Sequence, residues 1–163
     1  MTVRVGIGYD VHPFAVDEPD RPLVLGGVTI DGHAALAGHS DADAVAHAVC
    51  DALLGAAGLP DLGTLYPASE GRWKNARSMD MLADVMQRLR SAGWDVGNVD
   101  IVINAEAPRL APHLGEMCQN LEAVLGADTT NLKPKRGEGI GSIGRVEGIA
   151  VYAVALVERR IDG

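Results

Sequence analysis

The segment "GIAVYAVALVERR" (148–160) constrains the fold of this chain more than any other stretch. It has the length of a β-strand and is apolar at almost every position up to Val157, without the polar alternation of a half-exposed strand. A strand that is apolar on both sides needs cover on both sides. We therefore expect helices on one face of its sheet and a partner molecule on the other.

The remaining pattern predicts strands and helices in the order β β α α β α β β. The strands are expected at 3–12, where Val3, Val5 and Ile7 alternate with smaller or polar residues, at 23–30 with a bulge at Gly26-Gly27, at 98–105, and as a short edge segment at 129–135. The helices are expected from a cap at Ser40, from a cap at Ser78 to a stop at Gly93, and over 112–125. This order predicts one α+β domain spanning 1–163, with a mixed sheet and helices packed on one face.

Composition excludes several classes of function. The net charge of −8 argues against direct binding to nucleic acid or to an anionic membrane. No apolar run approaches the roughly 18 residues that span a bilayer. The chain opens directly on a strand-like pattern, which favours a cytoplasmic protein. Cys50 and Cys118 fall in predicted helices, where they are expected to be small buried residues rather than a disulfide or a metal pair.

The first predicted helix carries an unusual row of polar residues. His39, Asp43, His47 and Asp51 recur every four positions, which places them along one ridge opposite Val45 and Val49. Such a ridge can be the solvated side of an amphipathic helix. However, the usual surface residues Lys, Arg and Glu are absent from this helix, and short Asp and His side chains hold their donor atoms close to the backbone. This absence favours a site.

A second polar pair lies in the first strand, where Asp10 and His12 project to the same side. Together with His47 they would supply one carboxylate oxygen and two imidazole nitrogens, a set typical of catalytic zinc with an open position. Asp43 or Asp51 would then hold the distal nitrogen of His47. Alone, the D-x-H pattern is common by chance.

The third constellation is basic. Lys133, Lys135 and Arg136 stand beside Glu138 and a run of glycines, and Arg109 and Arg145 add further cations; the glycines are Gly137, Gly139, Gly141 and Gly144. This stretch can be a flexible surface loop, or its backbone N–H groups can line an anion site. Combined with a divalent metal, the second interpretation indicates a polyphosphate ligand.

Four segments together resemble the 2-C-methyl-D-erythritol 2,4-cyclodiphosphate synthase family. They are "GIGYDVHPF", "HSDADAVAHAVCDALLGAAGLPDLGTLYP", "GNVDIVINAEAPRLAPH" and "SIGRVEGIAVYAVALVE", in the family's order and spacing over nearly the whole chain. The resemblance implies an enzyme of the non-mevalonate isoprenoid pathway. Its substrate would be 4-diphosphocytidyl-2-C-methyl-D-erythritol 2-phosphate, which it converts to the 2,4-cyclodiphosphate with release of CMP. It also implies a homotrimer with active sites between subunits, so that the second sheet face is buried in the trimer.

The resemblance further implies roles for individual residues. Asp10, His12 and His47 would bind zinc or a similar ion, and Glu138 a magnesium or manganese ion that accompanies the diphosphate. His39 would steady the transition state. The residues expected to contact substrate are Ser40, Asp61, Leu62, Gly63, Tyr66, Pro67, Ala68, Ser69 and Glu70 around the methylerythritol phosphate, Ala105, Glu106, Ala107, Pro108, Arg109, Leu110 and Ala111 around cytidine, and Lys135, Gly137, Ser142 and Arg145 near the phosphates.

This chain departs from the family pattern at three positions. Arg136, expected as a catalytic residue that donates to phosphate, replaces a Thr that helps to stabilise the transition state. Ala68 replaces an acid, and Ser142 stands at a position that varies. Two alternatives therefore stay open. One is a poorly active trimer that binds metal and a prenyl diphosphate in a cavity bordered by Arg145 and Glu147. The other is a metal-dependent nucleotide-diphosphate hydrolase.

Overall fold

The computed structural model describes residues 2–126 and 130–160, so Thr129 at the start of the expected edge segment lies outside the described residues. Thirteen elements follow one another along this part of the chain, with η denoting a short 3-10 helix. They are β1 (Val3–Pro13), β2 (Leu23–Leu25), β3 (Val28–Ile30), α1 (Ala44–Ala57), α2 (Leu62–Leu65), η1 (Gly71–Trp73), α3 (Ser78–Ser91), β4 (Trp94–Asn104), η2 (Ala111–His113), α4 (Leu114–Leu125), β5 (Thr130–Lys135), α5 (Gly141–Gly144) and β6 (Gly148–Arg159).

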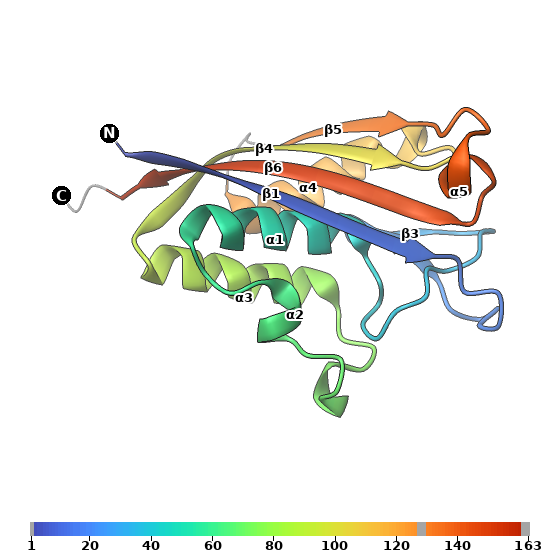
Figure 1. The fold of residues 1–163 in the computed structure, drawn as a ribbon, viewed down its shortest axis with the longest axis horizontal. Coiled ribbons are helices and arrows are strands. Elements are labelled where there is room, and N and C mark those ends of the chain that lie inside the picture. The colour runs from blue at the N-terminus through green and yellow to red at the C-terminus, as the bar shows by residue number, and fades with distance from the viewer. Residues whose placement is uncertain (1, 127–129, 161–163) are drawn as a thin grey trace.

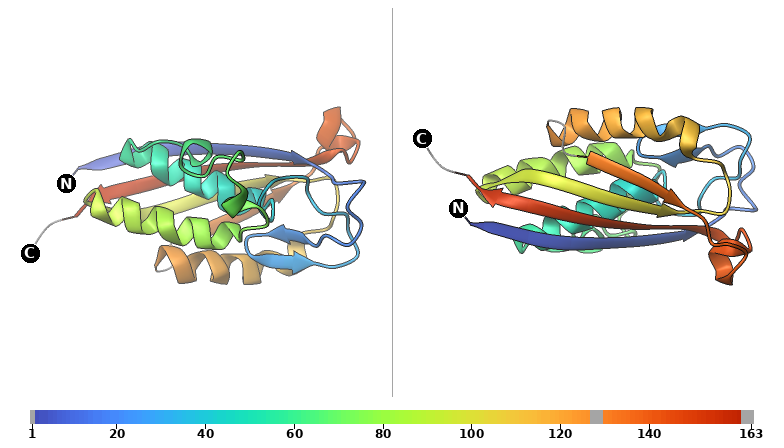
Figure 2. Two further views of the ribbon diagram at one scale, coloured as in Figure 1. Left: turned by 90° about the horizontal axis from the view of Figure 1, so that it is seen from below. Right: turned by 90° about the horizontal axis from the view of Figure 1, so that it is seen from above.

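Four strands form one mixed sheet in the order β1-β6-β4-β5. Strand β6 runs antiparallel to both β1 and β4, whereas β5 runs parallel to β4. The helices α1, α3 and α4 all lie on one face of this sheet (Figures 1 and 2). The predicted α+β architecture with helices on a single face is therefore confirmed.

The two faces of β6 differ in their surroundings. Its inward residues, among them Ile149, Val151 and Ala153, are fully buried on the helical side. Its outward residues Tyr152 and Val154 are 46% and 43% exposed. They continue into an apolar row on β1 that consists of Val3, Val5, Ile7, Tyr9 and Val11, with Ile7 70% exposed. One chain thus covers only one of the two apolar faces that its sequence predicts.

Close packing between β1 and α1 depends on two glycines. A Cβ atom on Gly8 would lie 1.8 Å from the backbone oxygen of Ala48, and one on Gly6 would lie 2.0 Å from that of Ala52. The strand therefore turns its glycine side to the helix and its Val/Ile side outward. Because side chains alternate along a strand, Asp10 and His12 fall on the same side as the glycines and face α1.

Two sequence expectations about local structure were wrong. Helix α1 begins at Ala44 rather than near Ser40, because the Asp43 carboxylate accepts hydrogen bonds from the backbone N–H groups of Val45 and Ala46 and caps the helix. Asp43 is buried and does not lie on the ridge with His47. The segment 23–30 is a β2–β3 hairpin rather than one bulged strand, because Gly26 and Gly27 both adopt positive φ and form its two-residue turn.

Other expectations need smaller changes. Ser78 is the first residue of α3, which Arg77 precedes at the cap position without a side-chain bond. Cys50 is buried as expected, whereas Cys118 is only partly buried; both are free thiols. Among the described residues, no helix has the length and apolar character needed to cross a membrane. The cytoplasmic location stays a prediction.

We predict opposite effects on stability for two glycine-to-alanine changes. Gly8→Ala would press its methyl group into the Ala48 carbonyl and destabilise the fold by about 3 kcal/mol or more. Gly115→Ala in α4 meets no atom within 4 Å, and it should stabilise the fold by up to about 1 kcal/mol. Urea unfolding of the two variants measures both effects. Equal stabilities would contradict the tight β1–α1 contact.

Candidate functional site

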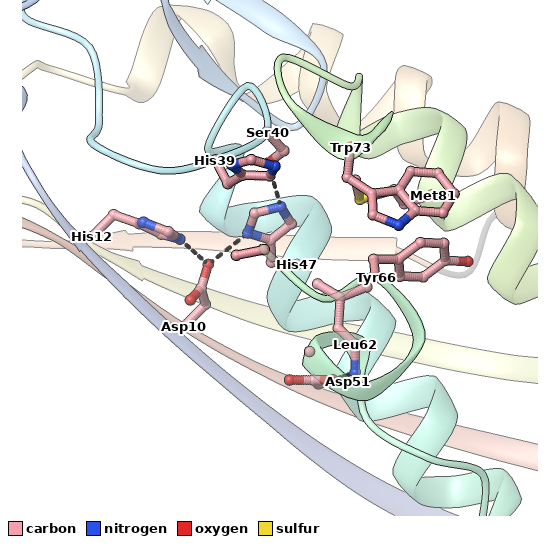
Figure 3. A pocket seen from close by; sticks show the side chains of 12 residues that line it. Asp10, His12, His39, Ser40, His47, Asp51, Leu62, Tyr66, Trp73 and Met81 are labelled. Carbon is pink, nitrogen blue, oxygen red and sulfur yellow. Dashed lines mark hydrogen bonds and ion pairs between the residues drawn. The ribbon is translucent and has the colours of Figure 1, made fainter. Parts of the chain in front are cut away.

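Three side chains from two elements converge beside the β1–α1 contact. Asp10 and His12 project from β1, and His47 projects from the exposed side of α1 (Figure 3). The Asp10 Oδ2 atom lies 2.9 Å from His12 Nε2 and 3.0 Å from His47 Nδ1. One ligand atom from each residue lies within 4.8 Å of the other two. The convergence predicted from sequence is confirmed, and the cluster is consistent with a metal site.

Hydrogen bonds outside the cluster orient both imidazoles. His12 Nδ1 lies 2.6 Å from the Ala37 carbonyl oxygen and donates to it, so Nε2 is the ring nitrogen that faces Asp10. His47 Nε2 lies 2.8 Å from Ser78 Oγ and 3.1 Å from Ser40 Oγ. The expectation that Asp43 or Asp51 holds His47 was therefore wrong, because both carboxylates bind backbone N–H groups instead.

Burial and charge act against one another in this cluster. Burial raises the pKa of Asp10, but the hydrogen bonds and positive charges of His12 and His47 outweigh it and lower the pKa to about 2. Burial lowers the pKa of His12, but the hydrogen bond and charge of Asp10 raise it to a net value above the ordinary 6.5. Asp10 is therefore ionised near neutral pH, as a metal ligand must be.

The cluster forms part of the wall of a cavity of about 310 Å³. The residues that line it from α1, β1 and the loop before α1 are Asp10, His12, His39, Ser40, His47 and Asp51, and those opposite are Leu62, Gly63, Tyr66, Ala68, Trp73 and Met81. The sequence predicts roles for ten of these twelve residues, as metal ligands, a ligand's partner, a catalytic residue or substrate contacts, but not for Trp73 and Met81. Trp73 carried a usable signal, because it is an aromatic residue in a long loop of a chain with only 4% aromatic residues.

A second cavity, of about 460 Å³, lies where β4 and β5 end. It is lined by Ala105, Glu106, Pro108, Arg109, Leu110 and Ala111 together with Pro134, Lys135 and Arg136. Arg136 does not extend freely, since its Nε and terminal nitrogen both donate to Glu106 Oε1 across the cavity wall. The structure thus brings the residues expected around cytidine together with two of the basic residues.

The remaining expected residues lie outside both cavities. Asp61, Pro67, Ser69 and Glu70 adjoin lining residues of the first cavity, and Ala107 adjoins those of the second. Gly137 and Glu138 lie in the turn after β5, Ser142 lies in α5, and Arg145 directly follows α5. Lys133 is paired with Asp100, and Arg145 with Glu147.

The two cavities occupy opposite edges of the sheet. The first lies beside β1 and the second beside β5, with β6 and β4 between them. Three strand spacings of about 4.8 Å separate these edges by about 14 Å. No residue lines both cavities. Within the described part of one chain, the carboxylate–histidine cluster and the basic residues do not form a single site.

Comparison with known proteins identifies the family. The YgbB family matches residues 3–158. The chain belongs to the YgbB family. It is 48% identical to the 2-C-methyl-D-erythritol 2,4-cyclodiphosphate synthase of Synechocystis sp., an alignment that covers 95% of this chain and 96% of the relative. It is also 48% identical to the synthase of the same name from Bordetella petrii, over 96% of each chain.

Solved structures of similar proteins have the same fold. The bifunctional IspDF of Campylobacter jejuni gives a TM-score of 0.91 at 39% identity, covering 99% of this chain and 43% of that one. The Plasmodium falciparum IspF in complex with CDP gives 0.84 at 32% identity, covering 98% and 97%. The chain is thus a 2-C-methyl-D-erythritol 2,4-cyclodiphosphate synthase by its family and relatives, as its sequence indicated.

The charge coupling in the cluster predicts a pKa change that can be measured. In the metal-free protein, the pKa of His12 lies above 6.5 because Asp10 outweighs burial. In Asp10→Asn burial acts without that carboxylate, so the pKa of His12 should fall below 6.5. NMR titration of the His12 ring protons measures it. Asp100→Asn, which removes a carboxylate on β4, should leave the pKa of His12 unchanged, and an unchanged pKa in Asp10→Asn would refute the coupling.

Proposed function

We propose that this YgbB-family enzyme catalyses an intramolecular phosphoryl transfer. An oxygen of the 2-phosphate of 4-diphosphocytidyl-2-C-methyl-D-erythritol 2-phosphate attacks the β-phosphorus, and the bond between the β-phosphorus and the bridging oxygen breaks. That oxygen leaves with CMP, and the 2,4-cyclodiphosphate remains. The observation that carries this proposal is the Asp10–His12–His47 cluster in the wall of a cavity that also presents His39 and Ser40.

A divalent ion, zinc or a similar metal, suits the donor atoms of this cluster. Asp10 Oδ2, His12 Nε2 and His47 Nδ1 would hold it, since two imidazole nitrogens and one carboxylate oxygen are the set that catalytic zinc takes with an open position. When bound, the ion supplies a Lewis acid for a phosphate oxygen. Glu138 is exposed and would hold magnesium or manganese together with the diphosphate, because magnesium is typically bound through few carboxylates plus substrate phosphates.

The chain's own residues hold the reacting groups together. We assign His39 to the charge that develops at the phosphates and Ser40 to the methylerythritol phosphate. Asp61, Leu62 and Gly63 contact the hydroxyl groups, with the loop from Tyr66 to Glu70 alongside. No side-chain nucleophile is needed, because attacker and target belong to one molecule. Holding them in a reactive arrangement can lower the barrier by about 7–11 kcal/mol.

The second cavity suits the nucleotide. Ala105, Glu106, Ala107, Pro108, Arg109, Leu110 and Ala111 surround cytidine in this proposal, and Lys135, Gly137, Ser142 and Arg145 lie towards the phosphates. The complex of the Plasmodium falciparum relative with CDP supports a nucleotide ligand. Arg136 takes a different part from the Thr that it replaces: through Glu106 it joins the ends of β4 and β5 and stiffens the cavity wall.

We further propose a homotrimer whose active sites lie between subunits. Two observations support it. The sheet face with Ile7, Tyr9 and Tyr152 is apolar and exposed in one chain, and an assembly would bury it. In addition, one substrate must reach both cavities, which lie on opposite edges of the sheet. A cyclic arrangement places the first cavity of one chain beside the second cavity of its neighbour.

The proposed chemistry predicts that metal and product formation are lost together. His47→Ala should release the zinc and lower CMP release at least about 100-fold, because even partners of metal ligands contribute 10–100-fold. Metal analysis and chromatography of the products measure both. The exposed His33→Ala serves as the control and should match the wild type. CMP formed with a linear product would indicate the hydrolase instead, and metal retained in His47→Ala would refute the site.

Shared sites predict complementation between two inactive variants. His47→Ala damages the first cavity and Lys135→Ala the second, so each alone should have little activity. After subunits are mixed in equal amounts and reassembled, about a quarter of the interfaces should pair two intact cavities and recover activity. The same procedure with either variant alone is the control. No recovery in mixed trimers, with subunit exchange shown by mass spectrometry, would place the whole site within one chain.

A further inference from the structure

Two residues outside the ligand cluster form a hydrogen-bonded chain behind His47. Ser78, the first residue of α3, is fully buried, and its Oγ lies 2.8 Å from His47 Nε2. Its hydroxyl donates to the Asp41 carboxylate, and its backbone N–H donates to the other oxygen of Asp41 at 3.1 Å. Ser40 Oγ lies 3.1 Å from His47 Nε2 (Figure 3). It also lies 3.3 Å from Ser78 Oγ.

The hydrogen bonds of Ser78 determine the tautomer of His47. A serine hydroxyl has one hydrogen, and Ser78 donates it in the hydrogen bond to Asp41. Ser78 Oγ can therefore only accept from His47 Nε2, which must carry the hydrogen. The lone pair of a neutral His47 then lies on Nδ1, the nitrogen 3.0 Å from Asp10.

We propose that Ser78 and Asp41 are positioning residues for the metal centre, which select the Nε2–H tautomer of His47 and direct its Nδ1 lone pair to the ion. This inference rests on the proposed metal site. A carboxylate that polarises a histidine through a hydrogen bond makes the other ring nitrogen a stronger ligand, and here the serine hydroxyl transmits that effect.

The two histidines of the cluster differ in this respect. The tautomer of His12 is set by the backbone carbonyl of Ala37, which no side-chain substitution removes. The tautomer of His47 depends on side chains alone. Asp43 cannot replace Asp41, because its two oxygens already accept from the backbone of Gly26, Gly27 and the first turn of α1. Substitution of Ser78 or Asp41 can therefore change the tautomer of His47, whereas the tautomer of His12 is held by the backbone.

The test is the zinc affinity of the purified protein without substrate, measured by competition with a chromophoric chelator. Ser78→Ala removes the nearer hydroxyl acceptor and the link to Asp41, and it should weaken zinc binding about 10–100-fold. Asp41→Asn keeps an amide oxygen but loses the charge, and it should fall between wild type and Ser78→Ala. Ser91→Ala, an exposed serine at the other end of α3, is the matched control and should bind zinc as tightly as the wild type.

A second readout separates positioning from a loss of stability. Long-range ¹⁵N NMR of the metal-free protein should show His47 as the Nε2–H tautomer in the wild type and as a mixture in Ser78→Ala. Should Ser78→Ala not fold, Asp41→Asn answers the same question.

The outcomes also separate this inference from the proposed function. If the wild type binds zinc and both variants match it in affinity and tautomer, the positioning role of Ser78 and Asp41 is refuted, while the proposed metal site stands. If the wild type binds no zinc, both the metal site and this positioning role are refuted.

Discussion

The short distance between β1 and α1 is the constraint on which the rest of the molecule depends. Gly6 and Gly8 let backbone meet backbone, at positions where any Cβ atom would collide with helix carbonyls. The same alternation along β1 turns Asp10 and His12 towards the helix, where His47 meets them. A larger residue at either glycine would move strand from helix and separate the three ligand atoms. Packing and chemistry therefore impose the same requirement on this pair of elements.

That alternation has a second consequence on the opposite side of the sheet. With glycines facing the helix, β1 must display its Val and Ile side chains outward, and β6 adds Tyr152 and Val154 beside them. The Tyr9 and Tyr152 rings contact each other on this face, with centroids 4.9 Å apart. The exposed apolar face and the geometry of the carboxylate–histidine cluster thus follow from one pattern in one strand.

Local patterns of the sequence predicted much of this structure. Periodicity placed the main strands and helices, and the fixed side of Asp10 and His12 on an extended strand made the carboxylate–histidine cluster predictable together with His47. What failed depended on contacts between distant segments. The four-residue spacing of Asp43 suggested a place beside His47, but no pattern along the chain reveals that its carboxylate instead accepts from Gly26 and Gly27. The sequence around Ser78 predicts only a helix cap. Its hydrogen-bond partner Asp41 lies 37 residues away, so no local pattern reveals their contact. The family resemblance supplied the roles that spacing alone left open.

Three aspartates in α1 and in the loop before it, Asp41, Asp43 and Asp51, each fix a different segment of the chain. Asp43 ties the β2–β3 turn to the start of α1. Asp51 accepts from Leu62 N at 2.7 Å and holds the facing wall of the cavity against the same helix. Asp41 joins the loop before α1 to α3 through Ser78.

These three carboxylates therefore lie outside the Asp10–His12–His47 cluster, and each bonds the chain near α1 to a different neighbour. A cavity whose walls are held by separate hydrogen bonds needs little rearrangement when a charged ligand enters. This explains why short, stiff Asp side chains occupy the helix and its approach, where flexible Glu or Lys would hold nothing in place.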